Sequence, residues 1–115
     1  MILYAVLKEE QERRLSQLKS LGIKLEGGIA TFPSTYDTKI WVLHQGKQTV
    51  KIGIPREAFK DMNLKEVHIE DSPVEAFGYD CFTGNDNVTI YAKKQPYNCY
   101  PQNAYFIQEH IKYVK

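Results

Sequence analysis

The first part of the chain has a pattern of apolar residues that predicts a strand followed by a helix. Residues 1–7 are an almost wholly apolar run, which is typical of a short buried strand. After this run Leu15, Leu18 and Leu21 recur at three-residue intervals, and this spacing places them on one face of a helix. Glutamates come before arginines along the same segment, which is the order that the helix dipole favours. The pattern predicts one amphipathic helix over about residues 9–21.

The middle of the chain alternates apolar and polar residues with the period of two that β-strands have. Residues 39–44 and 49–54 are rich in β-branched and aromatic side chains, and a glycine-containing turn joins them, which predicts a β-hairpin. The first arm is apolar on both faces, so we expect it to be a central strand or to be covered by the helix. Residues 23–32, 65–70 and 87–92 predict further strands, and the alternation within residues 65–70 places Val67 and Ile69 inward. A pair of glycines predicts a turn or bulge within the first of these strands, and residues 83–87 predict a turn.

Two remaining segments complete the predicted fold. Pro55 can occupy the first turn of a short second helix over about residues 55–62. Residues 104–115 fit a helical face and a strand face, and their content of Tyr, Phe, Ile and Val favours a strand. We therefore expect an α+β fold in a single globular domain over residues 1–115, with a mainly antiparallel sheet of about five or six strands.

The composition is that of a folded domain, since 43% of the residues are hydrophobic and 25% are charged. Eight residues are tyrosines, which are common in half-buried sheets and in interfaces. No stretch approaches the ~20 apolar residues that span a bilayer, and no signal peptide is recognisable. We expect a cytoplasmic protein with no membrane contact. Its two cysteines, Cys81 and Cys99, are expected to be reduced there, although a disulfide between them stays open.

The charges are divided unevenly along the chain. The net charge of +1 argues against a protein that acts mainly by gripping phosphates. Residues 38–56 contain four basic residues and no acid, residues 57–86 contain eight acids against two lysines, and residues 87–115 contain four lysines against one glutamate. These segments can be ordinary solvated faces that pair in the fold, or complementary patches that steer a partner.

The sequence contains no recognisable catalytic or metal-binding motif. The histidines, His44, His68 and His110, are far apart, and the cysteines lack the close spacing of metal ligands, so we expect no metal and no cofactor. Cys81 is the best local candidate for a nucleophile, but Asp80 and Phe82 beside it supply no positive charge to stabilise a thiolate. Scattered acid–base groups, such as His44 with Lys47, leave a motif-poor ribonuclease as a minor alternative.

The segment KKQPYNCYPQNAY, residues 93–105, is the most distinctive part of the chain. It is long for a connection, and loops of that length tend to be functional or disordered. Its prolines and aromatic rings favour a stiff loop that can present tyrosines to a partner. The predicted partner-binding residues are Lys93, Lys94, Tyr97 and Tyr100, with Trp41 in reserve. Trp41 fits the core better than an interface, because its predicted strand is apolar on both faces.

The sequence thus favours a small non-enzymatic binding protein that modulates or inhibits a larger macromolecular partner, most simply another protein. Phage and mobile-element accessory proteins are often of this size and equally poor in motifs. The main alternative is a single-stranded nucleic-acid binder that uses the same lysines and tyrosines. A protein that sequesters a small ligand is a weaker alternative. An exposed sheet edge, or the basic hairpin, could also produce a homo-oligomer.

Overall fold

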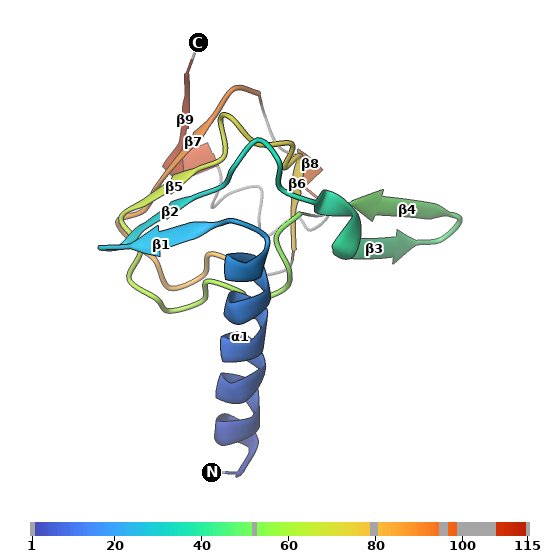
Figure 1. The fold of residues 1–115 in the computed structure, drawn as a ribbon, viewed down its shortest axis with the longest axis vertical. Coiled ribbons are helices and arrows are strands. Elements are labelled where there is room, and N and C mark those ends of the chain that lie inside the picture. The colour runs from blue at the N-terminus through green and yellow to red at the C-terminus, as the bar shows by residue number, and fades with distance from the viewer. Residues whose placement is uncertain (1, 52, 79–80, 95–96, 99–107, 115) are drawn as a thin grey trace.

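The computed structural model describes residues 2–51, 53–78, 81–94, 97–98 and 108–114 of the chain (Figure 1). Its elements are one long helix, a five-stranded main sheet and two separate two-stranded sheets. The predicted α+β class is confirmed. In the part of the chain that the structure describes, no helix is long and apolar enough to cross a membrane.

The chain begins with helix α1 (Ile2–Ser20), so the strand predicted over residues 1–7 is wrong. A short apolar run does not by itself distinguish a strand from a helix, and here it continues without a turn into a segment of good helix formers. The predicted leucine stripe is confirmed where the helix meets the body, since Leu18 is fully buried. Figure 1 shows that only the C-terminal end of α1 lies against the sheet and that the N-terminal end extends away from it.

The main sheet has the strand order β1-β2-β5-β7-β9, and four of its five strands are parallel to one another. Its strands are β1 (Lys24–Glu26), β2 (Ile29–Thr31), β5 (Glu66–His68), β7 (Thr89–Ala92) and β9 (Ile111–Tyr113). Only β1 and β2 are antiparallel, joined by the predicted turn at two glycines with positive φ. The expectation of a mainly antiparallel sheet is therefore wrong. Long connections return the chain to the same end of the sheet before each later strand, which makes these strands parallel.

The predicted hairpin is present but is not central. Strands β3 (Val42–Gln45) and β4 (Gln48–Lys51) pair antiparallel, and a short 3₁₀ helix, η1 (Thr38–Ile40), precedes them. Gly46 has the positive φ, 61°, that a two-residue hairpin turn requires of its first central residue. The two strands form a sheet of their own, and Figure 1 shows it projecting from the body. A strand that is apolar on both faces is therefore not necessarily a central strand of the main sheet.

Residues 55–62 form successive turns instead of the predicted short helix. Glu57 and Asp61 both have φ of 56°, in the left-handed region that interrupts a right-handed helix. The backbone N–H of Phe59 donates to the carbonyl of Cys81 at 2.9 Å, instead of to a carbonyl within a helix. A long-range backbone pairing has replaced the local one.

Part of the distinctive segment adopts an extended backbone. Strand β8 (Tyr97–Asn98) pairs in parallel with β6 (Ala76–Phe77). The other residues of the segment after Lys94 lie outside the described residues. Near the C-terminus, residues 108–110 form one helical turn before β9, so the strand prediction for residues 104–115 is confirmed for three residues, Ile111–Tyr113.

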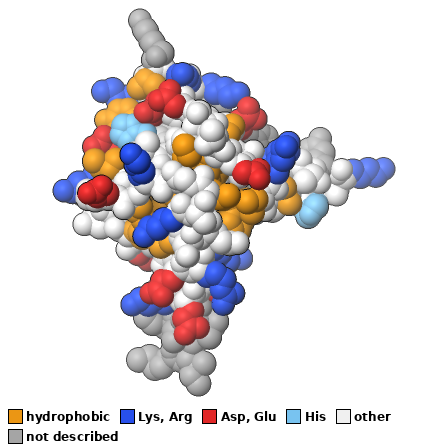
Figure 2. All heavy atoms as spheres, in the orientation of Figure 1, with side chains coloured by type: hydrophobic (Ala, Val, Ile, Leu, Met, Phe, Trp, Pro, Cys, Tyr) orange, Lys and Arg blue, Asp and Glu red, His pale blue; other side chains and the backbone are white. Residues whose placement is uncertain are grey.

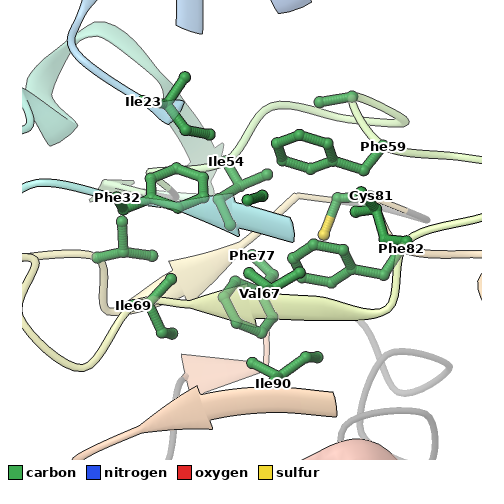
Figure 3. Packing of buried hydrophobic residues seen from close by; sticks show 14 of the residues in the cluster. Ile23, Phe32, Ile54, Phe59, Val67, Ile69, Phe77, Cys81, Phe82 and Ile90 are labelled. Atoms are coloured by element: carbon green, nitrogen blue, oxygen red, sulfur yellow. The ribbon is translucent and has the colours of Figure 1, made fainter. Parts of the chain in front are cut away.

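The core lies on one side of the main sheet (Figure 3). The inward residues of the central strands are Ala30, Val67 and Ile90, all fully buried. The connections between the strands supply the aromatic part of this core, namely Phe32, Phe59, Phe77 and Phe82. Phe59 and Phe82 stack with their ring centroids 5.7 Å apart. Because the connections pack against this side, the residues that alternate with the inward ones are on the opposite side of the sheet.

Candidate binding face of the main sheet

The side of the main sheet opposite the core carries a row of side chains that crosses all five strands. The row consists of Lys24, Thr31, His68, Tyr91 and Lys112, one residue from each strand. Because these residues are paired in register, their side chains leave the sheet on the same side. We call this surface the open face. Its central row has a lysine at each edge and an aromatic pair in the middle.

A second row lies beside the first on the open face. It consists of Glu26, Ile29, Glu66 and Thr89, which are also paired in register. Ile29 keeps 36% of its surface exposed and is one of few large apolar side chains so exposed among the described residues. In Figure 2, acidic and basic side chains are interspersed over the body of the molecule. The open face thus combines apolar, aromatic and charged groups of both signs.

The imidazole of His68 lies between two carboxylates, that of Glu66 on the same strand and that of Glu70 just after it. Its Nδ1 lies 2.8 Å from Glu70 Oε1 and its Nε2 lies 3.0 Å from Glu66 Oε1. A neutral imidazole has only one N–H, so one of these contacts would set a nitrogen lone pair against a carboxylate. The imidazolium can donate from both nitrogens at once. The geometry therefore favours the protonated ring.

The pKa of His68 reflects the same contacts. Partial burial lowers the pKa, but the hydrogen bonds to Glu70 and Glu66 and the negative charges of those groups raise it. The net result is a pKa above the ordinary value of histidine. The carboxylates prevail because the side chain keeps 26% of its surface exposed, so it loses only part of its hydration.

Tyr91 joins this ionic cluster to the neighbouring strand. Its ring stacks on His68 with centroids 4.6 Å apart and planes only 7° from parallel. On β9, Lys112 Nζ lies 5.9 Å from the centroid of the Tyr91 ring, which is within the range of a cation–π contact. Tyr91 thus has a cation near its ring and an imidazole stacked on it. These contacts hold the two rings in one orientation before any partner arrives, which lowers the entropy lost on binding.

A hollow of about 250 Å³ lies at the carboxyl ends of β5 and β7, and its apolar lining, Ile69, Val74 and Ala92, belongs to the core cluster. Its polar lining includes Glu70, Ser72, Lys93 and Lys94. The carboxyl ends of parallel strands are the usual place for a binding site in sheets of this kind. Across the described ranges, no group of three or more His, Cys, Asp or Glu side chains is placed to hold a metal ion.

The predicted lysine pair lies at this end of the open face, and each lysine has an acidic neighbour. Lys93 Nζ is 3.5 Å from Asp71 Oδ1 and Lys94 Nζ is 3.0 Å from Glu75 Oε1. All four side chains are mostly exposed, so these pairs contribute little stability. They do balance the charge of the lysine pair. Its positive field is therefore weaker than the sequence alone suggests.

The other predicted binding residues are separated from the open face or lie beyond the described side chains. Tyr97 has its backbone in β8, next to the buried strand β6, and Tyr100 lies outside the described residues. Trp41 is half-buried just after η1, and its indole Nε1 is buried without a hydrogen-bond partner among the described residues. Burial raises the pKa of the Tyr36 phenol, whose hydroxyl donates to the carbonyl of Gly53. Trp41 is not among the residues of the core cluster, so its assignment to the core or to an interface stays a prediction.

The candidate catalytic groups of the sequence are not gathered in one place. Cys81 is buried in the core, as a structural cysteine would be, and Cys99 lies outside the described residues. His44 is on the β3–β4 hairpin, where its Nδ1 lies 3.3 Å from Thr49 Oγ1. His110 is at the other end of the chain, with its Nδ1 2.8 Å from the carbonyl oxygen of Val88.

The sequence did not single out His68 and Tyr91 as a pair. The alternation of residues 65–70 predicted that Val67 and Ile69 point inward, which is confirmed, and so it implied that His68 points outward. What the sequence did not indicate was the residue that lies beside His68 on the next strand. Twenty-two residues separate His68 from Tyr91, and only the parallel register of β5 and β7 brings them together.

No family model, curated protein or solved structure matches this chain. The open face and its chemistry are therefore the basis for a functional assignment.

Proposed function

We propose that this chain is a small non-enzymatic binding protein that modulates a larger protein partner, and that the open face is its main contact surface. One observation carries the proposal: the outer side of a mostly parallel sheet displays a preorganised aromatic pair, His68 and Tyr91, within a rim of charges. Lys93 and Lys94 directly follow β7 and extend the charged rim at that end of the sheet.

The packing of the sheet supports a partner on this side. Parallel sheets are normally covered on both faces, because their crossover connections carry helices onto each side. Here the described connections pack on the core side, and the other side presents half-buried rings and an exposed Ile29. A central aromatic group with a polar rim is the usual composition of a protein interface.

The charges of the open face favour protein over nucleic acid. Its basic groups, Lys24, His68 and Lys112, are accompanied by the acidic groups Glu26, Glu66 and Glu70. A single-strand binder combines stacking rings with a positively charged groove that follows the phosphates. A surface whose charges cancel lacks that attraction. A protein partner with charges of both signs is compatible with it.

The experiment is affinity capture from an extract of the native host with the tagged protein and with its Tyr91→Ala variant, followed by mass spectrometry. We expect the wild-type protein to retain a protein partner after nuclease treatment. If Tyr91 is a central contact, its truncation should weaken binding by about thirtyfold, since central aromatic residues contribute about 2 kcal/mol or more.

The matched control is Tyr113→Ala. Tyr113 is also a tyrosine of the main sheet, on the edge strand β9, and 52% of it is exposed, but it is paired with Ala92 on the core side of the sheet. Its removal should leave capture unchanged. Capture that nuclease abolishes would favour the nucleic-acid alternative, and equal capture by wild type and Tyr91→Ala would refute the open face as the contact surface.

A further inference from the structure

The β3–β4 hairpin is a second surface, distinct from the open face. Its paired residues, Val42 with Lys51 and His44 with Thr49, leave the same side of the hairpin. We call this side the hairpin face. All four side chains are exposed, and the contact between His44 and Thr49 links the two strands. The hairpin projects from the body, so this face is accessible to a large partner (Figure 1).

Within the part of the chain that the structure describes, no acidic side chain pairs with the lysines of the hairpin segment. Residues 38–56 contain no acid, and Lys39, Lys47 and Lys51 are all exposed. Among the described residues, none of these three lysines forms an ion pair, whereas both lysines at residues 93–94 do. Figure 2 shows basic side chains at the projecting tip. The hairpin lysines are therefore available to pair with an acidic group of another molecule.

Apolar side chains are exposed beside these lysines. Ile40 is 46% exposed and Val42 is 40% exposed, and they are two of the four large apolar residues so exposed in the described part of the chain. An isolated two-stranded hairpin is only marginally stable in water, because it buries little apolar surface. A partner that covered Val42 would bury apolar surface that the monomer leaves in water.

We propose that the hairpin face docks an acidic, partly apolar segment of a protein partner. Carboxylates of that segment would pair with Lys47 and Lys51, and an apolar side chain would cover Val42. Three lysines without an arginine are few for a nucleic-acid site, since such proteins commonly neutralise about 6–10 phosphates. The exposed valine also suits a protein segment better than a phosphate backbone. This surface is independent of the open face.

The test uses the full chain labelled with ¹⁵N and, as the probe, a short soluble peptide that alternates Glu and Leu. We expect the peptide to shift the backbone amide signals of residues 42–51 and to leave those of β5 and β7 unchanged. The double variant Lys47→Ala/Lys51→Ala should bind the peptide about tenfold more weakly, because it removes two exposed charge pairs. Its thermal midpoint should stay close to that of the wild type, since both lysines are exposed.

The control variant is Lys8→Ala/Lys19→Ala, which removes the same charge from two exposed lysines of α1. It should bind the peptide as the wild type does. Equal weakening by both double variants would show a general charge effect and would overturn the proposal. So would tighter binding of oligo(dT) than of the peptide, or concentration-dependent shifts of the hairpin signals without peptide, which would indicate self-association.

Discussion

Asn85 offers the sharpest test of how this fold is held together. Its side chain is almost fully buried, with 1% of its surface exposed, in the turn before β7. Its Oδ1 accepts from the backbone N–H of Leu64, and its Nδ2 donates to the carbonyls of Phe59 and Phe82, each at 2.8 Å. One side chain therefore links the turns at residues 55–64 to the turns at residues 81–87, which lie just before β7.

The magnitude follows from these three bonds. Asn85→Ala would leave the buried N–H of Leu64 and the carbonyl of Phe59 without their partner, and each unsatisfied group costs about 1–3 kcal/mol. The carbonyl of Phe82 would lose one of two bonds, since it also accepts from the backbone N–H of Asn85 at 3.2 Å. Water entering the vacated space would recover part of this. We expect a loss of about 3–5 kcal/mol in the free energy of unfolding, which is a large share of the ~5–15 kcal/mol that a domain usually has.

Urea unfolding followed by circular dichroism measures this change. With a slope of about 1–3 kcal/mol per molar urea, the midpoint should fall by about 2 M. The matched control is Asn87→Ala, since Asn87 is the same residue type in the same turn but is exposed. It should change stability by no more than about 0.5 kcal/mol.

Asn85→Asp separates hydrogen bonding from packing. It keeps the shape and the acceptor for Leu64, but it loses both donated bonds and buries a carboxylate. It should destabilise the protein at least as much as the alanine variant. A loss below about 1 kcal/mol for Asn85→Ala, or equal losses for Asn85→Ala and Asn87→Ala, would refute the role assigned to this network.

Three further predictions concern other parts of the fold. Because the pKa of His68 is raised on folding, protonation of His68 stabilises the native state. This contribution is complete below the ordinary pKa of histidine, about 6.5, and is lost as the pH rises through the raised native pKa. Urea unfolding measured over a range of pH should therefore show a step in stability for the wild type that His68→Gln lacks. Tyr36→Phe should cost about 1–2 kcal/mol in urea unfolding, because the buried hydroxyl donates to the carbonyl of Gly53 at 2.5 Å. Gly84→Ala should lower the thermal midpoint, because Gly84 has φ of 88° and an added Cβ would overlap the carboxylate of Asp61; an unchanged midpoint would contradict this reading.

Much of the local structure could be predicted from the sequence. Alternation located β5 and β7, and it assigned Val67 to the core. Glycines located the turns of both hairpins, where the backbone takes positive φ. These features depend on a few neighbouring residues, and the physical rules that govern them act over the same short range.

The candidate site could be predicted only in part. The lysine pair was found because two adjacent charges are visible in the sequence, but its acidic neighbours, Asp71 and Glu75, were not. His68 was noted only as an isolated histidine, since its stacking partner is on another strand. In the same way, the turn at residues 83–87 was predicted, but nothing in it indicated that Asn85 is buried and Asn87 exposed.

The sequence by itself determined the class of the fold, the positions of most strands and the residues that face inward, because hydrophobic periodicity encodes burial one element at a time. Only the tertiary structure decided that the strands are mostly parallel and that residues 55–62 are turns, because backbone bonds to distant segments outweighed local preference there. It also decided that Thr31, His68, Tyr91 and Lys112 form one row, since that row depends on the register of strands far apart in the sequence.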